Sequence, residues 1–365
     1  MNRRDKLLRR LRIPACAVLV SLAVGCRGWV IARMTGGRYP VSSLLVDTLA
    51  FAAILAALHG LDIGLRAGLR RAFGASTRSR RALTYGFRLL VLVLVVGPFL
   101  LVTLQLHPPR IRCVENPMSL GMQFSEVTLA SDGRRLSAWD IPGTEESAPI
   151  VLIAHGLNAN KANFLPAAAI LYDHGYSVFM FDFRGHGDSE GRTITLGYRE
   201  SEDVKAAYDW IVKAHPGRRV YALGFSMGGT AVVRAAAVHG IFEKIALDST
   251  FARVEDVARG RILKYLGPLS APVWHAGRFW AWAWSGVDLD DHRPVECIPA
   301  LARKPLMFIH GTADGVIPCS QSEALAKASG GRGALWLVPG MDHVESMADA
   351  EAYGKRLEEF FGKGE

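Results

Sequence analysis

The sequence predicts an α/β protein whose mostly parallel sheet carries helices on both faces and follows an N-terminal region of membrane-spanning helices. Two observations support this prediction. From residue 124 onward, short apolar segments alternate with longer helix-like segments, which is the pattern of a parallel sheet. Before residue 107, three long apolar runs lie between clusters of Lys and Arg, which is typical of membrane proteins.

The chain has 365 residues and a net charge of +9, and this charge is unevenly distributed. The first 106 residues hold 16 of the 43 Lys and Arg but only 3 of the 34 Asp and Glu. The rest of the chain is therefore mildly acidic. Because the basic residues belong to the apolar N-terminal third, they do not indicate a nucleic-acid surface, and we expect no nucleic-acid partner.

The apolar runs are candidate membrane spans at residues 13–32, 44–61 and 89–106. A helix needs about 20 apolar residues to cross the hydrocarbon core of a bilayer. The first run contains Arg27, whose charge would have to reach the membrane surface. An alternative for this run is a bacterial lipoprotein signal, since "LAVGC" ends at Cys26 after a basic head. A second alternative is that the runs are buried core helices.

The basic segments predict the orientation of these spans. "MNRRDKLLRRLR" and "RAGLRRAFGASTRSRR" each carry six Lys or Arg, whereas "RMTGGRYP" carries two. The positive-inside rule places the first two segments in the cytoplasm. We therefore expect a multi-pass anchor at 1–106 and a globular domain at 107–365 on the extracytoplasmic (periplasmic) side. A lipidated Cys26 would leave that domain on the same side.

The elements of the globular domain follow from its apolar periodicity. Residues 124–142 predict a hairpin that turns at Asp132-Gly133. Six further strands are expected at 150–154, 177–181, 220–225, 244–247, 306–309 and 334–338, which gives an eight-stranded sheet. Helices are expected at 161–175, 198–217, 227–240, 320–329 and 345–361. Ligands bind beyond the carboxyl ends of strands in such sheets, so residues directly after each strand are the functional candidates.

Ser226 stands at one such position, inside "VYALGFSMGGTAVV" at 220–233. A G-x-S-x-G pattern at a strand-to-helix turn forces the serine into a strained conformation and exposes its hydroxyl. The alternative is a turn packed with small residues. The start of the following helix favours an oxyanion, so the N–H of Met227 is an expected donor, together with the N–H of Leu157 after "HG".

His343 and Asp314 complete a set of nucleophile, base and orienting carboxylate. His343 follows the last predicted strand, and Asp314 follows the strand before it. A serine needs a neighbouring imidazole to take its proton, and the imidazole needs a carboxylate to hold its other N–H. Asp248 also follows a strand and is the competing orienting residue.

These motifs together resemble those of the α/β-hydrolase fold family over residues 118–362. The resemblance rests on "HGLNANK", "FDFRGHGDSEG", "LGFSMGG", "HGTADGVIP" and "GMDHVES", in that order. It is nearest to membrane-anchored bacterial serine hydrolases related to acylaminoacyl peptidases and esterases. It implies a Ser226–Asp314–His343 triad, an oxyanion hole from Leu157 and Met227, and no cofactor.

Residues 251–300 fall where this family inserts a lid, and this stretch holds four of the eight tryptophans. One interpretation is that these rings fill the core of the lid. The other is that Trp280 and Trp284 bind an acyl chain or rest on lipid. In an extended segment Trp280, Trp282 and Trp284 would form one apolar wall, whereas a helix would spread them over both sides.

The resulting functional hypothesis is a serine hydrolase for carboxylic esters or thioesters with a hydrophobic or lipid-like acyl group. A serine peptidase using the same triad and a catalytically idle binding or scaffold protein are the alternatives. The five cysteines show no metal-ligand spacing, so no metal is expected. In an oxidising compartment, one pair among Cys113, Cys297 and Cys319 could form a disulfide.

Overall fold

The computed structural model describes residues 77–362, except 109 and 146, together with six positions between 60 and 68. The chain comprises two compact units, residues 1–98 and 99–365. The first predicted apolar run, and nearly all of the second, lie outside the described residues. Multiple crossings and the boundary of the anchor at residue 106 therefore stay predictions.

A long apolar helix precedes the globular domain. Helix α3 (Thr77–Val91) continues through the π-helical turn Leu92–Val96 into α4 (Gly97–Leu106). Of the residues that the structure describes, Ala82–Leu106 form the one helix long and apolar enough to cross a membrane: it has 25 residues, and the mean hydropathy over an 18-residue window within it is 2.7. This helix contains the third predicted run and begins several residues before it.

The sheet has eight strands in the order β1-β2-β4-β3-β5-β6-β7-β8, and it is parallel except where β2 pairs with β1 and β4. The prediction of a mostly parallel eight-stranded sheet is therefore confirmed. Asp132 and Gly133 have φ angles of 46° and 71°, which is the backbone that a two-residue hairpin turn requires. The strands are β1 (Ser125–Ser131), β2 (Arg134–Ile141), β3 (Ile150–Ala154), β4 (Ser177–Phe181), β5 (Val220–Phe225), β6 (Ile245–Asp248), β7 (Leu306–Gly311) and β8 (Ala334–Val338).

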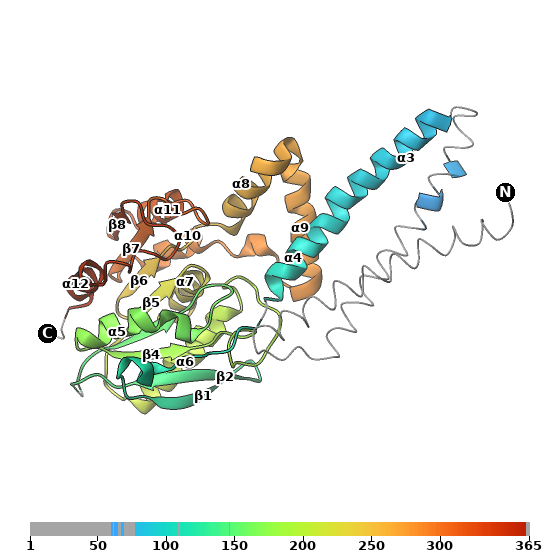
Figure 1. Cartoon of the computed structure of the whole chain (residues 1–365). Coiled ribbons are helices and arrows are strands. Elements are labelled where there is room, and N and C mark those ends of the chain that lie inside the picture. The colour runs from blue at the N-terminus through green and yellow to red at the C-terminus, as the bar shows by residue number, and fades with distance from the viewer. Residues whose placement is uncertain are drawn as a thin grey trace. The chain divides into compact units, whose positions relative to one another are not determined.

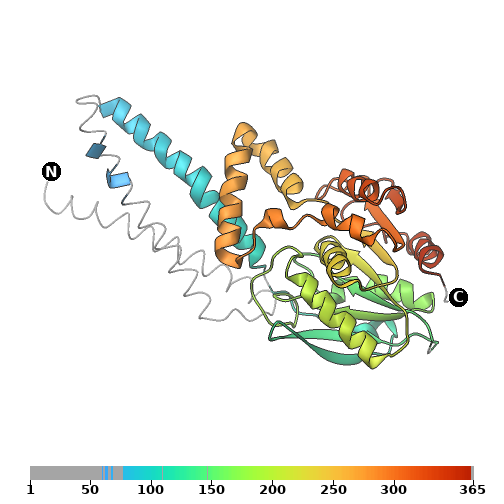
Figure 2. The same cartoon turned by 180° about the vertical axis from the view of Figure 1, so that it is seen from behind.

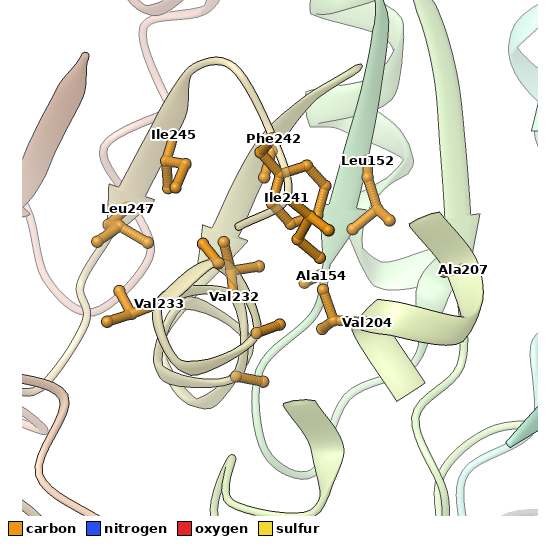
Figure 3. Close-up of a cluster of buried hydrophobic side chains, with 14 of the residues drawn as sticks. Leu152, Ala154, Val204, Ala207, Val232, Val233, Ile241, Phe242, Ile245 and Leu247 are labelled. Atoms are coloured by element: carbon orange, nitrogen blue, oxygen red, sulfur yellow. The ribbon is translucent and has the colours of Figure 1, made fainter. Parts of the chain in front are cut away.

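Helices cover both faces of this sheet (Figure 1), because β3, β4 and β5 are buried at every position and send alternate side chains to opposite faces. One core lies under α6, α7 and α11, and the other lies under α5 and α12. Figure 3 shows part of the first core, where Leu152, Val204 and Val232 point into one cluster. These helices are α5 (Leu165–Asp173), α6 (Glu200–Ala214), α7 (Met227–His239), α11 (Ser320–Ala328) and α12 (Ala350–Phe361).

Several predicted boundaries differ from the structure, among them those of β6 and α12. Strand β6 ends at Asp248, one residue later than predicted. Helix α12 begins at Ala350 rather than 345, because the Asp349 side chain caps its first turn by accepting a hydrogen bond from the Ala352 N–H. The residues before Asp349 therefore belong to a loop, and this loop carries His343.

The segment between β6 and β7 is the stretch in which the lid is expected, and we refer to it as the lid. It contains α8 (Val254–Leu266) and α9 (Ser270–Ser285), which project from the sheet as a pair, followed by the short helix α10 (Pro294–Cys297) (Figures 1 and 2). Residues 270–285 are helical, so of the two conformations considered for the tryptophans the helix is the one that forms, and an extended segment with a single apolar wall does not. Trp274 is buried in a cluster with Leu106, Phe251 and Ile317. Cys113, Cys297 and Cys319 are free thiols.

Candidate active site

Ser226 occupies the corner between β5 and α7. Its φ of 52° and ψ of −118° lie where a residue with a Cβ is strained. The Ser226 N–H donates a hydrogen bond to the Asp248 carbonyl at 2.8 Å, which continues the pairing of β5 with β6 into the corner. The strained conformation is therefore held by the sheet itself, and the Ser226 side chain is buried.

The glycines around Ser226 let backbone segments pack closely. A Cβ on Gly224 would lie 2.5 Å from the Cα of Gly229, and a Cβ on Gly228 would collide with the carbonyl oxygens of Ala154 and His155. No side chain therefore fits at Gly228 unless α7 moves away from β3. The corner is built from small residues because the helix start lies directly on the neighbouring strand.

We expect Gly228→Ala to destabilise the domain by several kcal/mol, since its methyl group would meet rigid backbone rather than a movable side chain. Thermal unfolding of the purified protein would measure this loss. Gly240→Ala is the matched comparison, because Gly240 ends the same helix at φ 70° and a Cβ there would meet no atom within 4 Å. Equal losses for both variants would contradict the packing argument.

His343 lies between Ser226 and Asp314. Its Nε2 is 3.1 Å from the Ser226 Oγ, and its Nδ1 is 2.7 Å from the Asp314 Oδ2. Since a carboxylate only accepts, Nδ1 carries the proton in this arrangement, and Nε2 is left to accept the serine hydroxyl proton. The structure thus brings together the three residues that the sequence suggested for the triad.

Asp314 is held as a carboxylate by several donors. Its Oδ1 accepts hydrogen bonds from the N–H groups of Val316 and Ile317 at 2.8 and 2.7 Å. Its Oδ2 also lies 3.1 Å from the Nε2 of His310. Burial opposes ionisation, but the hydrogen bonds from His310, His343 and Ile317 outweigh it and hold the pKa of Asp314 well below its usual range.

Asp248, the competing carboxylate, has other partners. It is fully buried at the end of β6 and accepts hydrogen bonds from the hydroxyls of Ser249, Ser346 and Tyr353 at 3.0, 3.3 and 3.0 Å. Burial raises the pKa of Asp248 to about 6 despite these donors. Asp248 therefore links β6 to the loop and helix that follow β8, while Asp314 is the carboxylate on the His343 ring.

The loop that carries His343 has a second strained position next to the ring. Val344 has a φ of 61°, which is unusual for a β-branched residue, and its N–H donates to the Ser249 Oγ at 3.1 Å. Ser249 itself has a φ of 52°. The backbone on both sides of this hydrogen bond is thus held in a conformation that few side chains favour.

The two expected oxyanion donors lie at the ends of the elements beside Ser226. Met227 is the first residue of α7, so its N–H has no carbonyl partner within that helix. Leu157 follows Gly156, where an added Cβ would lie 3.4 Å from the Ser226 Cβ. The buried His155 supports this turn, since its Nδ1 lies 2.7 Å from the Gly156 carbonyl and its Nε2 accepts from the Phe183 N–H at 3.0 Å.

Sequence reasoning missed His310 and two buried ion pairs. His310 stands at the end of β7 and could have been noticed as the residue before Gly311 in "HGTADGVIP". The Lys161 ammonium lies 2.6 Å from Asp182, and Arg184 lies 2.7 Å from Asp203. These pairs brace the "HGLNANK" and "FDFRGHGDSEG" loops beside the site.

The Lys161 ammonium also lies among three potential metal ligands. The ligand atoms of Cys113, Asp182 and Asp188 lie within 4.8 Å of one another. Lys161 Nζ lies 3.5 Å from the Cys113 Sγ, 2.6 Å from Asp182 and 3.8 Å from Asp188. A protein cation already sits among these groups, so they act as the surroundings of an ion pair.

Trp280 and Trp284 lie one turn apart on α9. Both rings contact Phe99 of α4, with ring centres 5.1 and 6.0 Å apart, and Trp284 also contacts His107. These contacts belong to the lid and the end of the apolar helix. A role for the two tryptophans in substrate binding stays a prediction.

Comparison with known proteins agrees with the fold. The family model described as "Serine aminopeptidase, S33" matches residues 145–283. A Salmonella typhi protein, "Uncharacterized protein YfhR", is 30% identical over 239 residues, covering 60% of this chain and 74% of the relative. The chain belongs to the α/β-hydrolase family.

Two further relatives of this α/β hydrolase are informative. The Pyrococcus furiosus esterase Pf2001 is 25% identical with a TM-score of 0.58, covering 70% of this chain and 98% of the esterase. The Saccharomyces cerevisiae "Uncharacterized membrane protein YNL320W" is 30% identical over 159 residues, 43% of this chain and 54% of the yeast protein. The chain is thus an α/β serine hydrolase with an esterase among its structural neighbours.

Proposed function

We propose that this α/β hydrolase cleaves carboxylic ester or thioester bonds through an acyl-enzyme intermediate. The observation that carries the proposal is the His343 ring, which lies 3.1 Å from the Ser226 hydroxyl and 2.7 Å from the Asp314 carboxylate. Ser226 Oγ attacks the carbonyl carbon while its proton passes to His343 Nε2. His343 then gives this proton to the departing alcohol or thiol.

The remaining residues stabilise the charges that form during this reaction. Asp314 accepts the Nδ1–H and stabilises the imidazolium. The N–H groups of Leu157 and Met227 bind the oxyanion, and one such donor contributes about 3 kcal/mol. Water, activated by His343, then releases the acid and restores Ser226. No cofactor takes part in these steps.

One feature favours a hydrophobic acyl group, and another favours an ester bond. The apolar cluster of the lid includes Phe251, Trp274 and Ile317, and Ile317 follows the Asp314 turn. The likeness to the esterase Pf2001 favours an ester over an amide. A serine peptidase is the second candidate, because the matching family model is described as an aminopeptidase.

A substrate screen separates these possibilities. We expect the purified full chain to react with a fluorophosphonate probe and to hydrolyse p-nitrophenyl esters, with kcat/KM rising with acyl length and exceeding the value for aminoacyl amides. Faster cleavage of the amides would favour the peptidase. The absence of both labelling and turnover would indicate an idle binding or scaffold protein.

We also propose that residues 1–106 anchor the enzyme as a multi-pass membrane protein, with the catalytic domain of residues 107–365 outside the cytoplasm. The support is the apolar helix Ala82–Leu106, the two further apolar runs, and the excess of basic residues in the segments expected inside. The yeast relative is also named as a membrane protein.

This topology predicts the behaviour of reporters fused after residue 365. A reporter that is active only in the periplasm should be active, and one that is active only in the cytoplasm should be silent. The reason is that three crossings leave the C-terminus outside. The opposite pattern would mean that one apolar run, most simply the run with Arg27, does not cross.

A further inference from the structure

The lid is joined to the end of the apolar helix by a layer of aromatic side chains. Phe99 of α4 packs edge-on against Trp280 at 5.1 Å between ring centres and against Trp284 at 6.0 Å. A Cβ on Gly277 would lie 3.6 Å from Val102, so α9 approaches α4 closely. One face of α9 is therefore covered by the last turns of the helix that is long enough to span a membrane.

Another face of α9, and the end of α8, expose large apolar side chains. Phe279 and Trp282 are 54% and 56% exposed, and their rings lie 6.3 Å apart. At the end of α8, Leu263 and Tyr265 are 56% and 79% exposed. Soluble domains rarely expose groups of large apolar side chains, so the pair on α9 and the pair on α8 are each candidates for a binding surface.

Basic residues outnumber acidic residues in this region. Residues 257–286 contain no Asp or Glu, but they contain four Lys or Arg. Arg259 and Arg278 pair with acids outside the stretch, at Glu255 and Asp288. Lys264 is exposed among the apolar residues at the end of α8. Tryptophan, tyrosine and basic residues together are the composition found at membrane–water interfaces.

We propose that the exposed apolar side chains of the lid, Leu263, Tyr265, Phe279 and Trp282, are embedded in the lipid bilayer next to the last turns of α4. The inference rests on the proposed membrane attachment and not on the hydrolytic chemistry. The occupant is lipid because the same helix that carries the aromatic layer runs on as the apolar segment Ala82–Leu106. The buried cluster beneath the lid extends to Ile317, so this placement brings the bilayer next to the site loops.

Photo-crosslinking in the full chain tests the proposal. A p-benzoylphenylalanine residue replaces Tyr265, Trp282 or, as the control, Val238, which is 58% exposed on α7. After expression and irradiation in intact membranes, mass spectrometry identifies the partner. We expect lipid adducts at positions 265 and 282 to exceed those at 238 several-fold, and the thermal unfolding of each variant verifies its fold.

Three results would overturn the inference: adducts to residues 1–76 of the same chain, adducts to a second copy, or lipid adducts no more frequent than at 238. Recovery of the chain in the soluble fraction would instead reject the membrane attachment on which the inference rests. Fluorophosphonate labelling of the same samples reports the hydrolase chemistry separately, so each failure is distinguishable.

Discussion

Ser226→Ala is expected to abolish fluorophosphonate labelling and to lower kcat by about 10⁶-fold, the loss typical when a catalytic serine is removed. The alanine keeps the Cβ, so the strained corner at φ 52° is retained while only the hydroxyl next to His343 is removed. Stopped assays with a long-chain p-nitrophenyl ester measure the effect.

The control for this variant is its stability. The temperature of thermal unfolding of Ser226→Ala should stay close to that of the parent. The reason is that the hydrogen bond that is lost joins the Ser226 Oγ to a ring, that of His343, which is only half-buried. Hydrolysis at the parent rate by a folded variant would remove Ser226 from the mechanism. If Ser226→Ala does not fold, its loss of activity says nothing about the mechanism. In that case Ser226→Cys reports whether a nucleophile at this corner is labelled.

Asp314→Asn is expected to lower kcat by about 10⁴-fold, the loss that the same change produces in serine proteases. The amide can donate a hydrogen bond to Nδ1 and so stabilise the tautomer whose Nε2 carries the proton. That tautomer cannot accept the Ser226 proton. The kcat for an activated ester, measured with KM, separates this loss from weaker binding.

Asp248→Asn is the matched comparison, since it is the same substitution on a buried carboxylate after the neighbouring strand. Its partners are hydroxyl groups rather than the catalytic ring, so we expect a change in kcat smaller than tenfold, a bound set by a weak indirect effect of about 1.4 kcal/mol. A greater loss for Asp248→Asn than for Asp314→Asn would exchange the roles of the two carboxylates.

Much of this arrangement was predictable because it depends on local patterns. The glycines around Ser226 can be recognised since backbone contacts at Gly224 and Gly228 exclude side chains. The number of strands and the position of His343 after the last one follow from apolar runs separated by polar loops. Local signals of this kind are encoded within a few residues of where they act.

The lid was harder to predict because its conformation depends on distant residues. Trp280, Trp282 and Trp284 alternate with small residues, which suits a strand, yet α9 is helical and packs against α4. His310 was missed for a related reason: its partners, Asp314, Ile317 and Ser322, come together only after the chain turns beyond β7. Tertiary contacts decide both cases.

The backbone strain at Ser226, Ser249 and Val344 means that turnover and thermal stability place opposite demands on these residues. Selection for thermal stability alone would favour glycine or asparagine in place of Val344, since both residues tolerate a φ of 61° more easily. His343, directly before Val344, would then lose the rigid neighbour that fixes its backbone. Variants selected for thermal stability should therefore carry their stabilising substitutions away from this loop, in the surface helices, where a gain in stability does not lower turnover.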